Sequence, residues 1–121
     1  MLISADTDDS RYQLRAYSPG KLQVNEEIYT SPLIISAEKI IPDWNVDIHA
    51  LTLAHFHFLD TFQVTLFLFG TGEKLIFPSA DILQWFSQLK IGFECMTTAA
   101  ACRTYTALAS EKRKVVAGLI V

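Results

Sequence analysis

The sequence contains little cysteine, and neither cysteine lies in a pattern that suggests metal binding. Cys95 and Cys102 sit among apolar and small residues, outside any Cys-x-x-Cys pair. Two cysteines seven residues apart could in principle pair, but disulfides are rare in reducing compartments. A buried free thiol behaves as a small hydrophobic side chain. We therefore expect two structural thiols in an intracellular protein, with no cofactor and no metal centre.

The sequence also lacks a long apolar run. No stretch approaches the roughly 20 residues that cross a bilayer, so we expect no membrane insertion. The first residues are followed by Asp8 and Asp9, whereas a secretory signal or transit peptide has a cationic and then an apolar segment. These features predict a cytoplasmic location.

Concentrated positive charge is the third absence. The chain has 10 Lys and Arg against 13 Asp and Glu, for a net charge of −3. Its cationic residues are scattered, apart from the run 112–114 (Lys-Arg-Lys), which we interpret as a solvated turn before the last strand. Nucleic-acid-binding proteins have a basic stripe that releases counterions from phosphate. We expect no nucleic-acid partner.

What the chain does have is enough apolar material for one core. At 121 residues and 50% hydrophobic residues, it fits a single domain spanning residues 1–121. The first third predicts an antiparallel β meander, because short apolar segments alternate with turn residues such as Ser18-Pro19-Gly20. Its expected strands are 12–17, 22–24, 28–30 and 33–35.

The rest of the chain alternates between strand and helix signals. From Thr52 to Phe62 the apolar spacing is helical. The continuous apolar run 64–69 is typical of a strand buried on both faces. Beyond it we predict a short strand at 75–77, a helix from Ser79, a strand at 91–96, a helix from Thr97 and a strand at 115–121. This βαβ pattern predicts an α/β fold with three layers, in which helices flank a mixed, mostly parallel sheet, plus the N-terminal antiparallel meander.

Three segments resemble a known protein family. They are 69–73 (Phe-Gly-Thr-Gly-Glu), 77–79 (Phe-Pro-Ser) and 91–105, whose Thr-Ala-Ala-Ala-Cys-Arg-Thr-Tyr run is the most specific part. The chain resembles a family of small proteins classed as a domain of unknown function, which includes the mitochondrial respiratory complex I assembly factor 3 and an adipogenesis-associated animal protein. The resemblance implies a three-layer fold with a mixed sheet and an additional β-rich portion. It implies no reaction, because none is established for the family.

Two loops could form a binding site at the carboxyl ends of adjacent parallel strands, where ligands gather in open α/β sheets. Glycines in the first loop let backbone amides approach a ligand. The second loop opens a helix, whose free amides attract an anion, and an arginine in that helix could bind a carboxylate or phosphate. We predict a small anionic ligand, or a partner's acidic side chain, at Gly70, Thr71, Gly72, Glu73, Thr97, Thr98 and Arg103.

A structural interpretation of the same residues stays open. The Gly-Thr-Gly segment would then only form a tight turn, and the two threonines would only cap a helix. Arg103 would pair with Glu73 or Glu94. The sequence matches neither the phosphate loop that ends in Gly-Lys-Ser/Thr nor the three-glycine dinucleotide fingerprint.

We find no catalytic set. The chain has no Gly-x-Ser-x-Gly elbow. His55 and His57 would lie on nearly opposite sides of a helix and cannot readily share a metal, His49 lies outside that helix, and no nearby cysteine completes a zinc set. Cys102 beside Arg103 could have some thiolate character, but we favour the alternative, an alanine-rich helix face packed close on the sheet with cysteine as one more small residue.

Three classes of function follow. The first, favoured by the resemblance and by the missing catalytic set, is a protein-interaction or assembly-factor-like module with an unknown protein partner. The second is a small-anion-binding domain that uses the two loops, and the third is an enzyme with an unrecognised site there. A homodimer is also compatible with the sequence, because an exposed strand edge can pair with a second copy.

Overall fold

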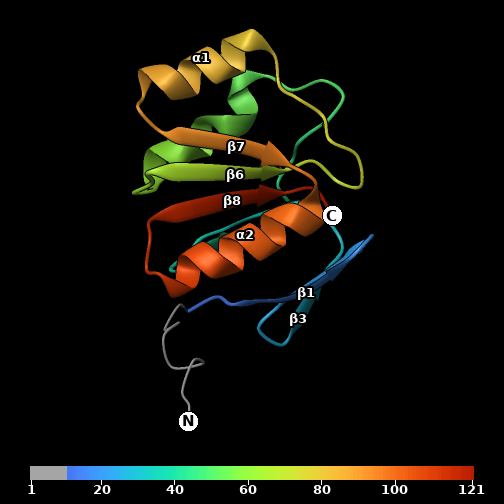
Figure 1. Ribbon diagram of the computed structural model, residues 1–121. Coiled ribbons are helices and arrows are strands. Elements are labelled where there is room, and N and C mark those ends of the chain that lie inside the picture. The colour runs from blue at the N-terminus through green and yellow to red at the C-terminus, as the bar shows by residue number, and fades with distance from the viewer. Residues whose placement is uncertain (1–10) are drawn as a thin grey trace.

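The computed structural model describes residues 11–121, which form two β-sheets and three helical segments (Figure 1). The chain order is β1 (Leu14–Ser18), β2 (Lys21–Val24), β3 (Glu27–Tyr29), β4 (Leu33–Ile35), β5 (Ile40–Ile41), the 3₁₀ helix η2 (Leu53–Thr61), β6 (Leu66–Gly70), α1 (Ala80–Gln88), β7 (Gly92–Met96), α2 (Thr98–Ser110) and β8 (Val115–Leu119). The predicted mixture of α and β structure is confirmed.

The larger sheet has the strand order β5-β4-β8-β6-β7. β6 pairs in parallel with both β7 and β8, whereas β4 pairs antiparallel with both β8 and β5. The sheet is therefore mixed, with as many antiparallel as parallel pairings. All five residues of β8 are buried, as a continuous apolar run predicts for a central strand.

The smaller sheet is the N-terminal meander, but it has only three strands, in the order β1-β2-β3. Its turns lie where the sequence places them, since Gly20 and Asn25 have positive φ values of 88° and 52°. The Asn25 side chain also accepts a hydrogen bond from the Gln13 backbone N–H at 2.9 Å. β4, which we predicted as the end of this meander, instead joins the larger sheet. Its three residues are all buried, so their apolar side chains need cover on both faces.

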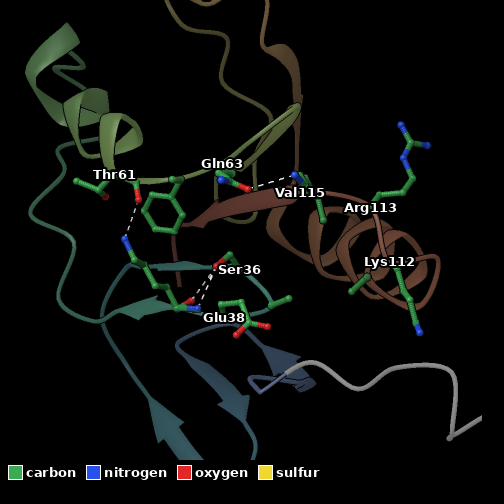
Figure 2. Close-up of a pocket in the computed structure, with 12 residues that line it drawn as sticks. Ser36, Glu38, Thr61, Gln63, Lys112, Arg113 and Val115 are labelled. Atoms are coloured by element: carbon green, nitrogen blue, oxygen red, sulfur yellow. Dashed lines mark hydrogen bonds between the residues drawn. The ribbon is translucent and has the colours of Figure 1, made fainter.

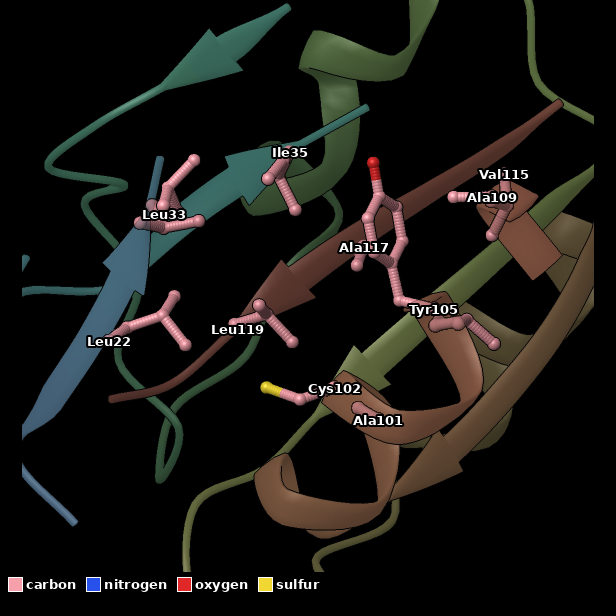
Figure 3. Close-up of a cluster of buried hydrophobic side chains, with 12 residues drawn as sticks. Leu22, Leu33, Ile35, Ala101, Cys102, Tyr105, Ala109, Val115, Ala117 and Leu119 are labelled. Atoms are coloured by element: carbon pink, nitrogen blue, oxygen red, sulfur yellow. The ribbon is translucent and has the colours of Figure 1, made fainter. Parts of the chain in front are cut away.

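Two hydrophobic clusters lie on opposite faces of the larger sheet. On one face, α2 and the meander cover the sheet, and Figure 3 shows Tyr105 and Cys102 of α2 facing Ala117 and Leu119 of β8. On the other face, η2 and α1 pack over an aromatic cluster. It consists of Trp44, Phe56, Phe67, Phe69 and Phe86, whose neighbouring ring centroids lie 5.5–6.3 Å apart.

The segment predicted as a helix from Thr52 to Phe62 is a 3₁₀ helix over most of that range. Its carbonyl at His55 accepts a hydrogen bond from Trp44 Nε1 at 2.9 Å. The Thr52 N–H donates a hydrogen bond to His55 Nδ1 at 3.1 Å. Side chains thus form hydrogen bonds with backbone groups near the start of the helix, where a tighter i→i+3 turn is common.

The short strand predicted at 75–77 is absent, because this segment is irregular. The backbone at Ile76 bonds to side chains and not to a neighbouring strand. α1 follows, with Ser79 as its N-cap residue, although the Ser79 side chain makes no capping hydrogen bond. No helix among residues 11–121 is long and apolar enough to cross a bilayer.

Candidate functional site

The two loops predicted as a site do meet in the structure. β6 and β7 are adjacent and parallel, and they end together at Gly70 and Met96. The Thr71 N–H donates to Met96 O at 2.9 Å, which continues the ladder by one step. One residue on, the Thr98 N–H donates to Gly72 O, also at 2.9 Å. We refer to residues 70–76 and 96–98 as the β6–β7 junction.

Thr98 is the centre of the β6–β7 junction. It is fully buried, and its hydroxyl accepts a hydrogen bond from the Gly72 N–H at 2.7 Å and donates one to Ile120 O at 2.6 Å. A Cβ atom at Gly70 would lie 3.0 Å from both Thr98 Cα and Thr98 Oγ1. The close approach of α2 therefore favours glycine at position 70, and the hydroxyl ties three segments of the chain together.

The Thr71 side chain fixes the first loop through hydrogen bonds to the loop backbone. Its buried hydroxyl donates to Lys74 O at 2.6 Å and accepts the Ile76 N–H at 3.2 Å. The Ile76 carbonyl in turn accepts a hydrogen bond from Cys95 Sγ at 3.0 Å, on strand β7. The irregular segment after β6 is thus fixed to its neighbours by side chains in place of a strand ladder.

The start of α2 also finds partners within the protein. Thr97 Oγ1 accepts the Ala100 N–H at 3.4 Å, and Thr97 O accepts the Ala101 N–H at 2.9 Å. The Thr98 N–H also donates to Gly72 O, so most amides of the first turn have hydrogen-bond partners. The predicted helix cap is therefore present, as the structural interpretation of these threonines requires.

The two charged members of the predicted site are exposed. Glu73 follows Gly72, and Arg103 lies on α2 next to the buried Cys102. Burial, with a smaller contribution from the Glu73 carboxylate, raises the pKa of Tyr17. Arg103 takes no part in the hydrogen bonds of the β6–β7 junction described above. An anion site at these seven residues stays a prediction.

Neither thiol has the character of a nucleophile. Burial raises the pKa of Cys102 to about 12, although Arg103 acts in the opposite direction, and it raises the pKa of Cys95 to about 11. Both thiols are therefore protonated at neutral pH. Among residues 11–121, no three His, Cys, Asp or Glu side chains are grouped so that they could hold a metal ion.

A pocket of about 410 Å³, which the sequence analysis did not predict, lies at the other end of the parallel strands (Figure 2). Three segments line it: the β4–β5 turn (36–39), the last residue of η2 with the two that follow (61–63), and the passage from α2 to β8 (109 and 112–115). The basic run 112–114, interpreted above as a solvated turn, forms part of its rim. Only the tertiary structure brings Lys39 to the same place.

Exposed apolar side chains gather in one part of the chain. Among the described residues, five large hydrophobic side chains are exposed, and four of them lie between β6 and β7: Leu75, Phe77, Leu83 and Leu89. The fifth is Ile28 on β3. Phe77 is the most exposed of the five, at 69%. Most other large apolar residues of the described chain are buried or half-buried, so the connection between β6 and β7 holds most of the exposed large apolar side chains.

The fold and these sites define a small mixed α/β domain whose loop threonines anchor its backbone and whose exposed large apolar residues lie mostly in the connection between β6 and β7. Comparison with known sequences then identifies the family of the chain. The chain belongs to the family described as protein of unknown function (DUF498/DUF598), whose model matches residues 14–120. The family resemblance inferred from residues 69–73, 77–79 and 91–105 is confirmed.

Named relatives of the chain include assembly factors and a membrane protein. It is 29% identical to NADH dehydrogenase (ubiquinone) 1 alpha subcomplex assembly factor 3 of Xenopus tropicalis, over 96% of this chain and 73% of that protein. The Danio rerio protein of the same name is 31% identical, over 87% of this chain and 62% of that protein. A 13 kDa major membrane protein of Francisella tularensis is 29% identical over 84% of each chain.

Solved structures of similar proteins share the fold. A Xanthomonas campestris protein is 38% identical and superposes with a TM-score of 0.84, over 93% of this chain and 86% of that one. A Bordetella pertussis protein described as a Mth938-like domain has a TM-score of 0.80 at 22% identity, over 99% of this chain and 92% of that one. The second likeness concerns the fold alone.

Proposed function

We propose that this chain is a protein-interaction module that helps to assemble a protein complex, and that it binds its partner through the connection between β6 and β7. The assembly-factor names of the frog and zebrafish relatives support the first part. The observation that carries the second part is the exposure of four large apolar side chains within residues 75–89. We call the exposed Leu75 and Phe77, two residues apart in the loop before α1, the apolar face.

Burial of the apolar face would provide a substantial driving force. Phe77 is 69% exposed and Leu75 is 47% exposed. Fully burying one such side chain contributes about 1.5–3 kcal/mol relative to leaving it in water. Leu83 on α1 and Leu89 just after its last residue are exposed as well. A few well-buried apolar anchors carry most of the binding energy in protein interfaces, and this number of side chains suffices for such a centre.

The β6–β7 junction gives the apolar face a fixed shape before binding. Thr71 Oγ1 bonds to Lys74 O and Ile76 N, and Cys95 Sγ bonds to Ile76 O. These contacts hold the backbone on both sides of Leu75 and immediately before Phe77. A loop that is already ordered loses less conformational entropy on binding, which favours affinity. The loop polar groups would then serve to present apolar side chains to a partner.

A pulldown from the native host with the tagged full-length chain tests this function. We expect a stoichiometric partner that is retained by the wild type and lost by the double variant Leu75→Ser/Phe77→Ser. Ile28→Ser is the matched control, because Ile28 is 55% exposed but lies on β3, away from the connection. Loss in both variants, or in neither, would contradict binding through the apolar face. Thermal unfolding of each variant confirms that the fold is retained.

An anion-binding function at the β6–β7 junction is the second candidate, supported by the meeting of the two predicted loops. It is tested by thermal shift with phosphate, sulfate and small carboxylates, repeated on Arg103→Ala. A ligand at 100 times its dissociation constant adds about 2.7 kcal/mol of stability. A flat screen at millimolar concentrations, or a shift that Arg103→Ala leaves unchanged, would exclude this site.

The proposed module acts as one domain over residues 1–121, in the cytoplasm, without catalysis, and without nucleic acid. A homodimer would use a strand at the edge of a sheet, such as β3. Light scattering at several protein concentrations checks this possibility, and Ile28→Ser then shows whether β3 takes part.

A further inference from the structure

The pocket at the start of β6 and β8 is independent of the apolar face. Its three lining segments come from well-separated parts of the chain, and it lies at the strand ends opposite to the β6–β7 junction. Its volume of about 410 Å³ is within the range of about 300–1,000 Å³ that small-molecule sites occupy. Figure 2 shows Thr61 and Gln63 on one side of it and Ser36 on another.

The pocket concentrates positive charge in an acidic protein. Four of the ten cationic residues of the chain line it, with Glu38 as the only carboxylate among the lining residues. The lining therefore has a formal charge of +3, and the rest of the chain has −6, since the total is −3. Lys112 and Arg113 follow the end of α2, where cations also offset the helix dipole. Lys39 comes from another segment, and the dipole does not explain its position.

Two ammonium groups are held in place on the pocket wall. Lys39 Nζ donates to Thr61 O at 2.8 Å and lies 4.6 Å from the centroid of the Phe62 ring. Lys114 Nζ donates to Gln63 Oε1 at 3.2 Å. An ammonium has three N–H donors, so each retains donors for a ligand. In Figure 2, Lys112 and Arg113 extend outward from the rim, where they would attract an anion by long-range electrostatics.

Apolar groups complete the lining. The apolar lining residues are Ala37, Phe62, Ala109 and Val115. An inorganic anion would use the ammonium groups and leave these apolar groups in contact with water. From this combination we infer that the pocket binds a small organic anion, namely a carboxylate on an apolar chain or ring. This inference goes beyond the proposed function and does not depend on it.

Octanoate is a suitable probe, because it has one carboxylate and an apolar chain. We expect it to bind saturably in calorimetry, with amide NMR shifts confined to residues 36–39, 61–63 and 109–115. Acetate supplies only the charge and octanol only the apolar chain, so each should bind at least about tenfold more weakly. Equal binding of octanol, or shifts centred on residues 70–77, would overturn the inference.

Paired charge variants test the role of the wall ammonium groups. Lys39→Gln/Lys114→Gln should weaken octanoate binding about tenfold, the loss expected for charge-assisted contacts at a partly exposed site. Lys21→Gln/Lys74→Gln is the matched control, because it removes two exposed lysines outside the pocket. Equal affinities of the two double variants would contradict the inference.

A blocking variant tests the cavity itself. Ala37→Trp places a large side chain in the lining and should abolish octanoate binding, while partner capture through the apolar face persists. Thermal unfolding verifies that the variant is folded. Octanoate binding unchanged in folded Ala37→Trp, or binding of an acidic peptide in place of octanoate, would refute a small-anion site.

Discussion

Replacing Thr98 with valine removes one hydroxyl and keeps the shape of the side chain. In the native structure this hydroxyl links the Gly72 N–H, at 2.7 Å, to the Ile120 carbonyl, at 2.6 Å, in a site with no exposure of Thr98 to solvent. The valine variant leaves both backbone groups without this partner. A buried polar group that loses its partner costs about 1–3 kcal/mol.

The expected loss of stability lies near the lower end of the summed cost for these two backbone groups. Gly72 and Ile120 are partly exposed as residues, so water replaces part of what Thr98 provided. We therefore expect the free energy of unfolding to fall by about 2 kcal/mol. For a chain of this length, that corresponds to a decrease in Tm of about 8 °C. Urea unfolding, followed by tryptophan fluorescence, measures the loss as a lower midpoint with an unchanged m-value.

Thr104→Val is the matched control in the same helix. It makes the same chemical change, but the Thr104 hydroxyl donates only to Met96 Sδ, at 3.5 Å, and sulfur is a weak acceptor. We expect it to change stability by less than about 0.5 kcal/mol. If the two variants lose the same stability, the hydroxyl of Thr98 does not hold the β6–β7 junction, and the reasoning is wrong.

Three further predictions concern the packed core and the thiols. Gly118→Ala should destabilise the fold by about 1–3 kcal/mol in the same urea assay, because its Cβ would lie 2.7 Å from Phe67 Cζ and 2.8 Å from Trp44 Cζ3; native-like stability would contradict this packing. Cys102 should react slowly with iodoacetamide at pH 8 in the folded protein and rapidly in urea, since burial raises its pKa to about 12; equal rates would refute its burial. The unfolded thiols ionise near their ordinary pKa of 9.0, whereas the folded thiols stay protonated up to about 11 for Cys95 and 12 for Cys102. Raising the pH through this interval should therefore lower the free energy of unfolding, with a smaller slope in Cys102→Ala when stability is measured at each pH.

Much of the fold could be predicted from local sequence. The uninterrupted apolar runs at β6 and β8 indicate central strands, and both are largely or wholly buried. The turn at Ser18-Pro19-Gly20 is present because glycine accepts a positive φ of 88°. The start of α2 at Thr98 follows from the capping side chain of Thr97. These features depend on torsional preference and apolar periodicity within a few residues, which the sequence contains.

The strand predictions were wrong where contacts with residues far away in the sequence decide the structure. Leu33–Ile35 reads as a further meander strand, but it pairs with β8, some 80 residues later in the chain. Leu75-Ile76-Phe77 has the composition of a strand, yet Thr71 and Cys95 side chains bind its backbone. Local pattern cannot distinguish these outcomes, because β pairing depends on which edges are free once the rest of the sheet has formed.

The candidate sites show the same division. The sequence by itself determined that the loops at 70–73 and 97–98 follow neighbouring strands, since two parallel strands joined by a helix end at the same edge of a sheet. It could not determine that Thr98 and Thr71 bond to the protein backbone, because those bonds depend on the approach of α2 to Gly70. The pocket and the apolar face were decided only by the tertiary structure. Charge and exposure at a point in space are sums over segments far apart in the chain, and only folding brings those segments together.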